Sequence, residues 1–169
     1  ISKEDLAWMK RGVDFLLTNQ NGDGSWRYPS GGTDLSNTQY ALLGLQAANR
    51  CGSLVPLKAW LAALEFLLGA QVEFGKPVLI KGNEVRGRYR FQWSEPALMR
   101  GFRYIPGNTA MPPTGSMTTA GLAGLIICQS EVWESRRFTA ELRLKARRGI
   151  RDAMAWLQDN FQVNRNPGQ

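Results

Sequence analysis

Apolar side chains recur every three or four positions over the first 19 residues, and this spacing predicts a helix with one apolar face. Ser2 followed by Asp5 is typical of a capping box at its start. The helix is expected to end near Gln20, because residues 21–24 (NGDG) form a turn sequence. The apolar stripe comprises Leu6, Met9, Val13, Leu16 and Leu17, and it is widened by Trp8 and Phe15.

The same pattern predicts four further helices. Residues 34–52 and 116–130 are small and apolar almost all round, which is typical of helices that are buried among other helices. Residues 56–71 and 138–161 are amphipathic, and the latter segment is strongly basic over its first half. We therefore expect amphipathic helices to alternate with wholly apolar ones.

Residues 72–100 interrupt the helical pattern. Residues 78–80 and 88–93 predict two strands, and aromatic residues alternate with arginine or glutamine in the second of them. Gly82 and Asn83 indicate a turn region between the strands. We interpret this segment as an insertion that resembles a β-hairpin.

The chain contains an internal repeat. Residues 15–20 (FLLTNQ) match residues 66–71 (FLLGAQ), and the serine, threonine and glycine positions of 36–45 recur in 116–125. Each unit is an amphipathic helix, a turn with glycine and an aromatic residue, and a small apolar helix. Such units bury their faces by stacking, so we expect inner and outer layers of helices and an exposed apolar end where a further unit would dock.

The composition limits the available chemistry. The chain has 169 residues, a net charge of +7 and no histidine, which excludes Ser-His-Asp, Cys-His and histidine-based zinc chemistry within it. Cys51 and Cys128 are too few for a disulfide framework, and both are interpreted as buried thiols. No apolar run approaches the ~20 residues of a membrane span. Because the chain begins at Ile1 and carries no signal peptide, we expect a piece of a longer protein and assign no compartment.

One stretch carries a resemblance to a known family. Arg11, Gly12, residues 15–17, Gln20, Gly24 and Trp26 resemble the QW motif of squalene and hopene cyclases. The alternating helix pairs resemble the α/α toroid that those cyclases share with protein prenyltransferase β-subunits. The resemblance implies an all-α fold of the α/α-toroid type. It would be one partial domain over 1–169, an incomplete barrel of about five main helices with the insertion at 72–100. It also implies that Gln20 and Trp26 tie a helix end to the following turn.

The resemblance also bears on catalysis. Bacterial cyclases carry an Asp-x-Asp-Asp-Thr motif at the start of an inner helix, and its central aspartate protonates the substrate. The matching residues 34–38 keep Asp34 and Thr38, but Ser36 stands where the acid would be. A serine hydroxyl is too weak an acid for that step, and the prenyltransferase zinc site requires a histidine. We therefore predict no catalytic residue, no metal and no cofactor.

Two groups of residues remain as candidate binding sites. Asp34, Ser36, Asn37 and Thr38 begin an inner helix, where they can cap it or line a ligand cavity. In and after the insertion, arginine and aromatic residues alternate; they form an ordinary amphipathic hairpin or a surface for an anionic or stacking partner. This second group is Arg88, Arg90, Trp93 and Arg103. The basic residues of 136–151 are more typical of a solvated helix face than of a nucleic-acid site.

Three functional hypotheses follow. The favoured one is a squalene cyclase- and prenyltransferase-like repeat domain that acts as a scaffold or ligand-binding module without cyclase chemistry of its own. Its partners would be an apolar or small-molecule ligand in the cavity, and the rest of a parent chain or another copy at the open repeat end. The alternatives are part of a terpenoid-processing enzyme with its catalytic residues elsewhere, and a carbohydrate-active α/α-toroid protein. A cavity with aromatic residues and no carboxylates would favour an apolar ligand, and paired carboxylates would favour sugar chemistry.

Overall fold

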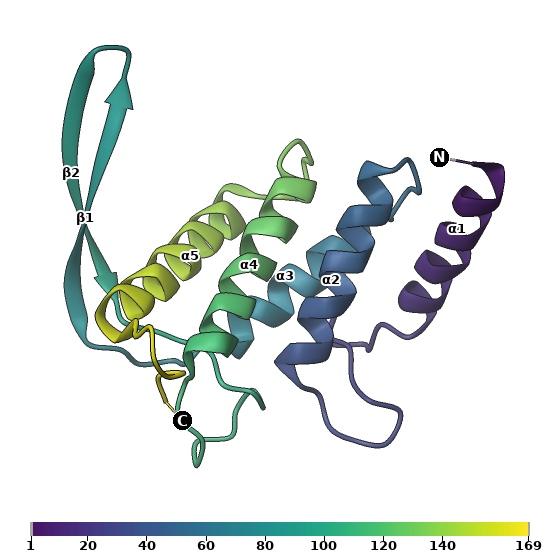
Figure 1. Cartoon of the computed structure of the whole chain (residues 1–169), viewed down its shortest axis with the longest axis horizontal. Helices are drawn as coiled ribbons and strands as arrows, with labels where there is room; N and C mark the ends of the chain where they lie inside the picture. The colour runs from purple at the N-terminus through teal and green to yellow at the C-terminus, as the bar shows by residue number, and fades with distance from the viewer. Residues whose placement is uncertain (1, 169) are drawn as a thin grey trace.

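The computed structural model describes residues 2–168, which form five helices and one two-stranded antiparallel sheet (Figure 1). The fold is therefore mostly helical and not all-α, because the predicted insertion is a regular β-hairpin. In chain order the elements are α1 (Lys3–Thr18), α2 (Leu35–Arg50), α3 (Leu57–Ala70), β1 (Pro77–Arg86), β2 (Tyr89–Leu98), α4 (Gly115–Val132) and α5 (Ala140–Asn160).

The helices begin where the sequence provides caps. Ser2 accepts the N–H of Asp5, and the Asp5 carboxylate accepts the N–H of Ser2 in return, which confirms the predicted capping box. Asp34 caps α2. Thr114 and Thr139 do the same for α4 and α5 through their hydroxyl oxygens.

The core forms around α4, which packs against α2, α3 and α5. Two glycines on α4 leave room for its neighbours: Gly124 for Leu67 of α3, and Gly121 for Phe102 of the turn before α4. A Cβ at Gly121 would lie 2.5 Å from the Phe102 ring, and a Cβ at Gly124 would lie 2.8 Å from Leu67. The expectation that α2 is equally enclosed is wrong, because Tyr40 is 71% exposed and Leu43 is 41% exposed.

Helix α1 lies at one end of the array and packs mainly against α2 (Figure 1). Within α1, Val13 alone is fully buried. The prediction that Trp8 and Phe15 extend its buried stripe is wrong, since they are 70% and 66% exposed. Both residues lie on the part of α1 that no other described element covers.

The hairpin projects away from the helices beyond α5 (Figure 1). Its turn lies at Gly87 and Arg88 and not at the predicted Gly82 and Asn83. Gly87 has φ +61°, as expected at the first position of a tight hairpin turn. Gly82 instead lies within β1 opposite Trp93, whose ring occupies the place that a Cβ on Gly82 would need.

An ion pair anchors the base of the hairpin to α5. The guanidinium of Arg100 contacts Asp152 Oδ2 at 2.7 Å, and Leu98 N donates to Asp152 Oδ1 at 2.9 Å. Asp152 is 4% exposed. Because its carboxylate is buried, these bonds are what offset its loss of hydration.

Candidate functional site

The predicted repeat appears as matched hydrogen bonds. Trp26 N donates to Thr38 Oγ1 at 3.1 Å, and Phe102 N donates to Thr118 Oγ1 at 3.0 Å. Both threonines are fully buried. Each bond joins a turn to the apolar helix that follows it, so Phe102 occupies in the second unit the place of Trp26 in the first.

The glutamines at the ends of α1 and α3 act alike. Gln20 Nε2 donates to the carbonyls of Gly24 and Ala59 at 3.0 and 3.1 Å. Gln71 Nε2 donates to the carbonyls of Arg100 and Gly149, both at 2.9 Å. Each glutamine thus joins its own helix end to the next turn and to the next amphipathic helix.

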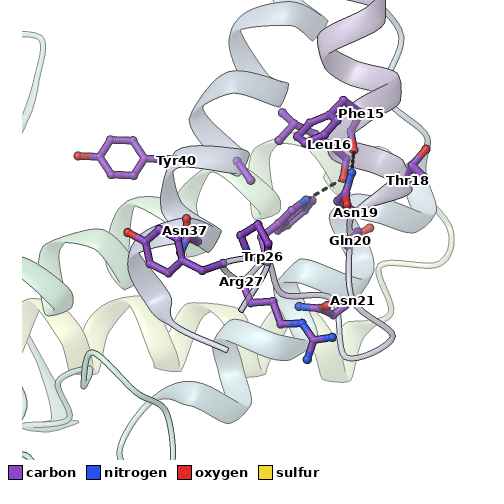
Figure 2. A pocket seen from close by; sticks show the side chains of 13 residues that line it. Phe15, Leu16, Thr18, Asn19, Gln20, Asn21, Trp26, Arg27, Asn37 and Tyr40 are labelled. Atoms are coloured by element: carbon purple, nitrogen blue, oxygen red, sulfur yellow. Dashed lines mark hydrogen bonds between the residues drawn. The ribbon is translucent and has the colours of Figure 1, made fainter. Parts of the chain in front are cut away.

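Trp26 completes this connection. Its indole Nε1 donates to the Leu16 carbonyl at 2.8 Å, near the end of α1, and its ring is 4% exposed (Figure 2). The predicted role of Gln20 and Trp26, to tie a helix end to the following turn, is confirmed by these bonds.

Three of the four cavity candidates, Asp34, Asn37 and Thr38, have hydrogen-bond partners within the chain. Asp34 is 3% exposed, and its two carboxylate oxygens accept from Asn37 N and Asn37 Nδ2, each at 2.7 Å. Thr38 Oγ1 accepts the N–H of Trp26 and also donates to the Asp34 carbonyl at 3.1 Å. Ser36 is half-buried.

Asn37 lines a hollow that is here called the α1/α2 groove. It lies between the end of α1 and the first half of α2 and has a volume of about 590 Å³ (Figure 2). Its lining contains four aromatic residues, three asparagines and one arginine, but no carboxylate. The lining side chains include Phe15, Trp26, Arg27, Tyr28, Asn37 and Tyr40.

The turn before α4 contacts the start of α2 near this groove. Leu35 N donates to the Tyr104 carbonyl at 3.0 Å. Burial raises the pKa of the Tyr104 phenol above its ordinary value of 10.0, and the Asp34 carboxylate and Tyr28 add to the increase. The capping carboxylate therefore affects an ionisable group of the second unit.

The four candidates for an anionic partner do not share one surface. Arg88 lies in the hairpin turn, and Arg90 and Trp93 project from opposite faces of β2 because an odd number of positions separates them. Arg103 lies beyond the other end of β2, where its Nε donates to the Met111 carbonyl at 2.6 Å.

The two thiols differ. Cys128 is buried, and burial raises the pKa of its thiol. Cys51 is exposed, contrary to the expectation of two buried thiols. The reason is local: Cys51 follows the last residue of α2 and precedes Gly52, whose φ of +91° turns the chain away.

Comparison of the chain with protein-family models, with curated proteins and with solved structures finds no match. Among the helices of residues 2–168, none is both long and apolar enough to span a membrane. In the same part of the chain, carboxylates and thiols do not gather in a group that could hold a metal ion.

The sequence prediction missed most of the α1/α2 groove. The sequence pattern places Phe15 and Tyr40 in predicted helices and Tyr28 in the loop between them, and it does not bring the three together. Tyr40 was the available signal, because a large amphipathic side chain interrupts an otherwise small apolar helix.

Proposed function

We propose that the chain is a non-catalytic helical-repeat module of the α/α-toroid type, related to squalene cyclases and prenyltransferases, that binds an apolar small molecule in the α1/α2 groove. The observation that carries this proposal is the lining of the groove, which combines exposed aromatic rings with amides and lacks carboxylates. Binding sites for small molecules commonly combine apolar walls with a few polar groups that fix orientation.

The Asp34 carboxylate lies beside Asn37 of this groove and accepts two hydrogen bonds. Both oxygens of Asp34 are engaged by Asn37, and Ser36 occupies the position of the proton donor in cyclases. Hydrolysis of a glycosidic bond commonly uses two carboxylates on either side of that bond. The groove therefore suits binding better than cyclisation or sugar hydrolysis.

The arrangement also suggests how a ligand would lie. The rings of Phe15 and Tyr40 would contact its apolar body, and Asn37 and Arg27 would bind a hydroxyl or other polar end. A prenyl alcohol such as farnesol has this chemistry. A sugar of similar size is polar along its whole length.

Calorimetric titration of the intact chain with farnesol and with maltose tests the proposal. We expect farnesol to bind and maltose not to bind. Tyr40→Ala and Phe15→Ala should each weaken farnesol binding about tenfold, because each removes aromatic area that the ligand would cover. Both side chains are largely exposed, so the fold should tolerate their removal.

Leu54→Ala is the matched control, because Leu54 is 87% exposed and lies outside the groove. It should leave the affinity unchanged. Binding of maltose in place of farnesol, or farnesol binding that neither aromatic substitution weakens, would contradict the proposal.

A module of this type also stacks with further helices at its ends. The exposed apolar side chains of α1 and α5, among them Trp8 and Met154, support this part of the proposal. A neighbouring segment of a parent protein would cover them.

A further inference from the structure

A continuous groove runs along α5 at the end of the array opposite to α1. A cavity of about 500 Å³ between α4 and α5 shares Gln129 and Ile150 with a second cavity of about 630 Å³. The second shares Ile80, Trp93 and Met154 with a third of about 450 Å³. We call the three together the α5 groove; residues from the end of α4, from α5 and from the hairpin line it.

The size and the surface of this groove suit a helix. Leu144 and Phe161 line its two ends on α5, and this distance corresponds to ~25 Å of helix, or ~17 residues. Leu144 is 49% exposed, Met154 is 48% exposed and Ile126, from α4, is 49% exposed. A row of half-exposed apolar side chains of this length marks an interaction site.

The internal repeat provides a filled counterpart of this groove. α4 lies against both α2 and α3. A Cβ at Gly124 would lie 3.2 Å from Leu42 of α2 and 2.8 Å from Leu67 of α3. Covered in this way, Leu42 and Leu67 are 0% and 1% exposed. In the first unit α4 therefore covers the face that α2 and α3 form together, and in the second unit the corresponding face of α4 and α5 is open.

Residue equivalences follow from shared bonds. Thr38 and Thr118 are equivalent, because each accepts a hydrogen bond from the backbone N–H of the aromatic residue in the turn before its helix. Leu42 of α2 and Leu122 of α4 each lie four positions after that threonine, so they correspond to each other. α3 and α5 end alike, since the residue after each helix donates to the carbonyl of Leu67 or Leu157. Unlike Leu42 and Leu67, Leu122 and Leu157 remain half-buried. The second pair lacks the helix that covers the first.

Buried polar atoms indicate the same missing neighbour. In the first unit, Asn49 Nδ2 donates to Glu131 Oε2 of the next apolar helix at 2.8 Å. Its counterpart is Gln129, whose Oε1 is buried without a hydrogen-bond partner among the described residues. Arg151 Nε is also buried without a hydrogen-bond partner among the described residues, and Arg151 lines the second cavity together with Gln129. Buried polar groups of this kind normally have partners.

We propose that the α5 groove binds a single α-helix of about 17 residues that resembles α4. Its contact face would carry glycine or alanine, as α4 does at Gly124, so that it can approach the leucines closely. It would present a hydrogen-bond donor to Gln129 and an acidic group to Arg151. This inference rests on the proposed repeat module but not on the ligand in the α1/α2 groove.

A peptide with the sequence of residues 34–51, labelled with fluorescein at its N-terminus, is the probe, because it reproduces the apolar helix of the first unit. Fluorescence anisotropy measures its binding to the intact chain. We expect saturable binding that Met154→Glu weakens at least tenfold, because the contact would have to remove a charged carboxylate from water and would lose the apolar contact of the methionine. Changing Gly44 of the peptide to leucine should weaken binding at least fivefold, since Gly44 corresponds to Gly124.

Leu54→Glu is the matched control in the protein, because it places the same charge on an exposed leucine outside the groove. It should leave peptide affinity within twofold of the unchanged chain. Absence of peptide binding, or equal affinity for the Met154→Glu chain, would overturn the inference. Self-association of the chain that Met154→Glu abolishes would also overturn it, because a second copy would then cover this face. Farnesol titration of the same variants distinguishes the two proposals. Farnesol binding without peptide binding would contradict only the helix in the α5 groove, whereas loss of farnesol binding would contradict the proposed function.

Discussion

The α1/α2 groove and the α5 groove lie at opposite ends of the helical array and differ in chemistry (Figure 1). The α1/α2 groove has aromatic rings beside asparagines. The α5 groove has half-exposed leucine, isoleucine and methionine beside two buried polar atoms that have no hydrogen-bond partner among the described residues. The same repeat therefore ends in two different kinds of surface.

Equivalent positions show how this difference arises. Tyr40 of α2 corresponds to Ala120 of α4, and their exposed fractions are 71% and 1%. Asn37 likewise corresponds to Met117. A large polar-tipped ring and an amide replace the small and apolar residues with which α4 packs into the core. The α1/α2 end therefore suits a ligand, whereas the α5 end keeps the leucines that a packed helix requires.

The largest effect should come from the ion pair that fixes the α5 end. Asp152→Ala would leave Arg100 without its partner, and we expect a loss of about 3–5 kcal/mol in the free energy of unfolding. Urea denaturation measures this loss. Under native conditions the same variant should lose affinity for the helical peptide, because the base of the hairpin is released, and should keep affinity for farnesol at the other end.

Glu95→Ala is the matched control for that experiment. Glu95 contacts Arg151 at 2.8 Å, but its side chain is 55% exposed. An exposed pair contributes about 1 kcal/mol or less. Equal losses from the two substitutions would mean that the buried pair does not anchor the hairpin.

A smaller effect should be common to both units. Thr38→Val and Thr118→Val keep the shape of the side chain but remove the acceptor of a buried backbone N–H. We expect each to cost about 1–3 kcal/mol in the free energy of unfolding, measured in urea. Thr119→Val, at an exposed position of α4, should have little effect. A large loss from Thr38→Val and none from Thr118→Val would show that the two units are not built alike.

Much of the helical part of the fold could be predicted from the sequence, because its signals are local. The Ser2 and Asp5 capping box and the position of Pro56 placed helix starts within two residues of the observed ones. The resemblance of residues 11–26 to the QW motif also implied that Gln20 and Trp26 are connecting residues. These features depend on neighbours within a few positions or on a motif that recurs in the chain.

The errors concern contacts between distant segments. Gly82 indicated a turn, but the glycine is required by the opposite strand, because the Trp93 ring occupies the place that a Cβ at position 82 would need. The exposure of Trp8 depends on which helix lies beside α1, and a helical pattern does not contain that information. The α1/α2 groove combines side chains from α1, a turn and α2, so no single stretch of sequence revealed it.

The smallest effect tests the electrostatic contact between the two units. Asp34→Asn keeps a good helix cap but removes a negative charge, so the pKa of Tyr104 should fall toward 10.0 while burial and Tyr28 keep it above that value. Absorbance at 295 nm follows the titration of the four tyrosines, and Tyr104→Phe identifies the one in question. The sign for stability follows from the raised pKa. Folding favours the neutral phenol of Tyr104. Its contribution to the free energy of unfolding is therefore complete below pH 10 and is lost as the pH rises through the folded-state pKa. An unchanged titration in Asp34→Asn would mean that the capping carboxylate does not act on the second unit.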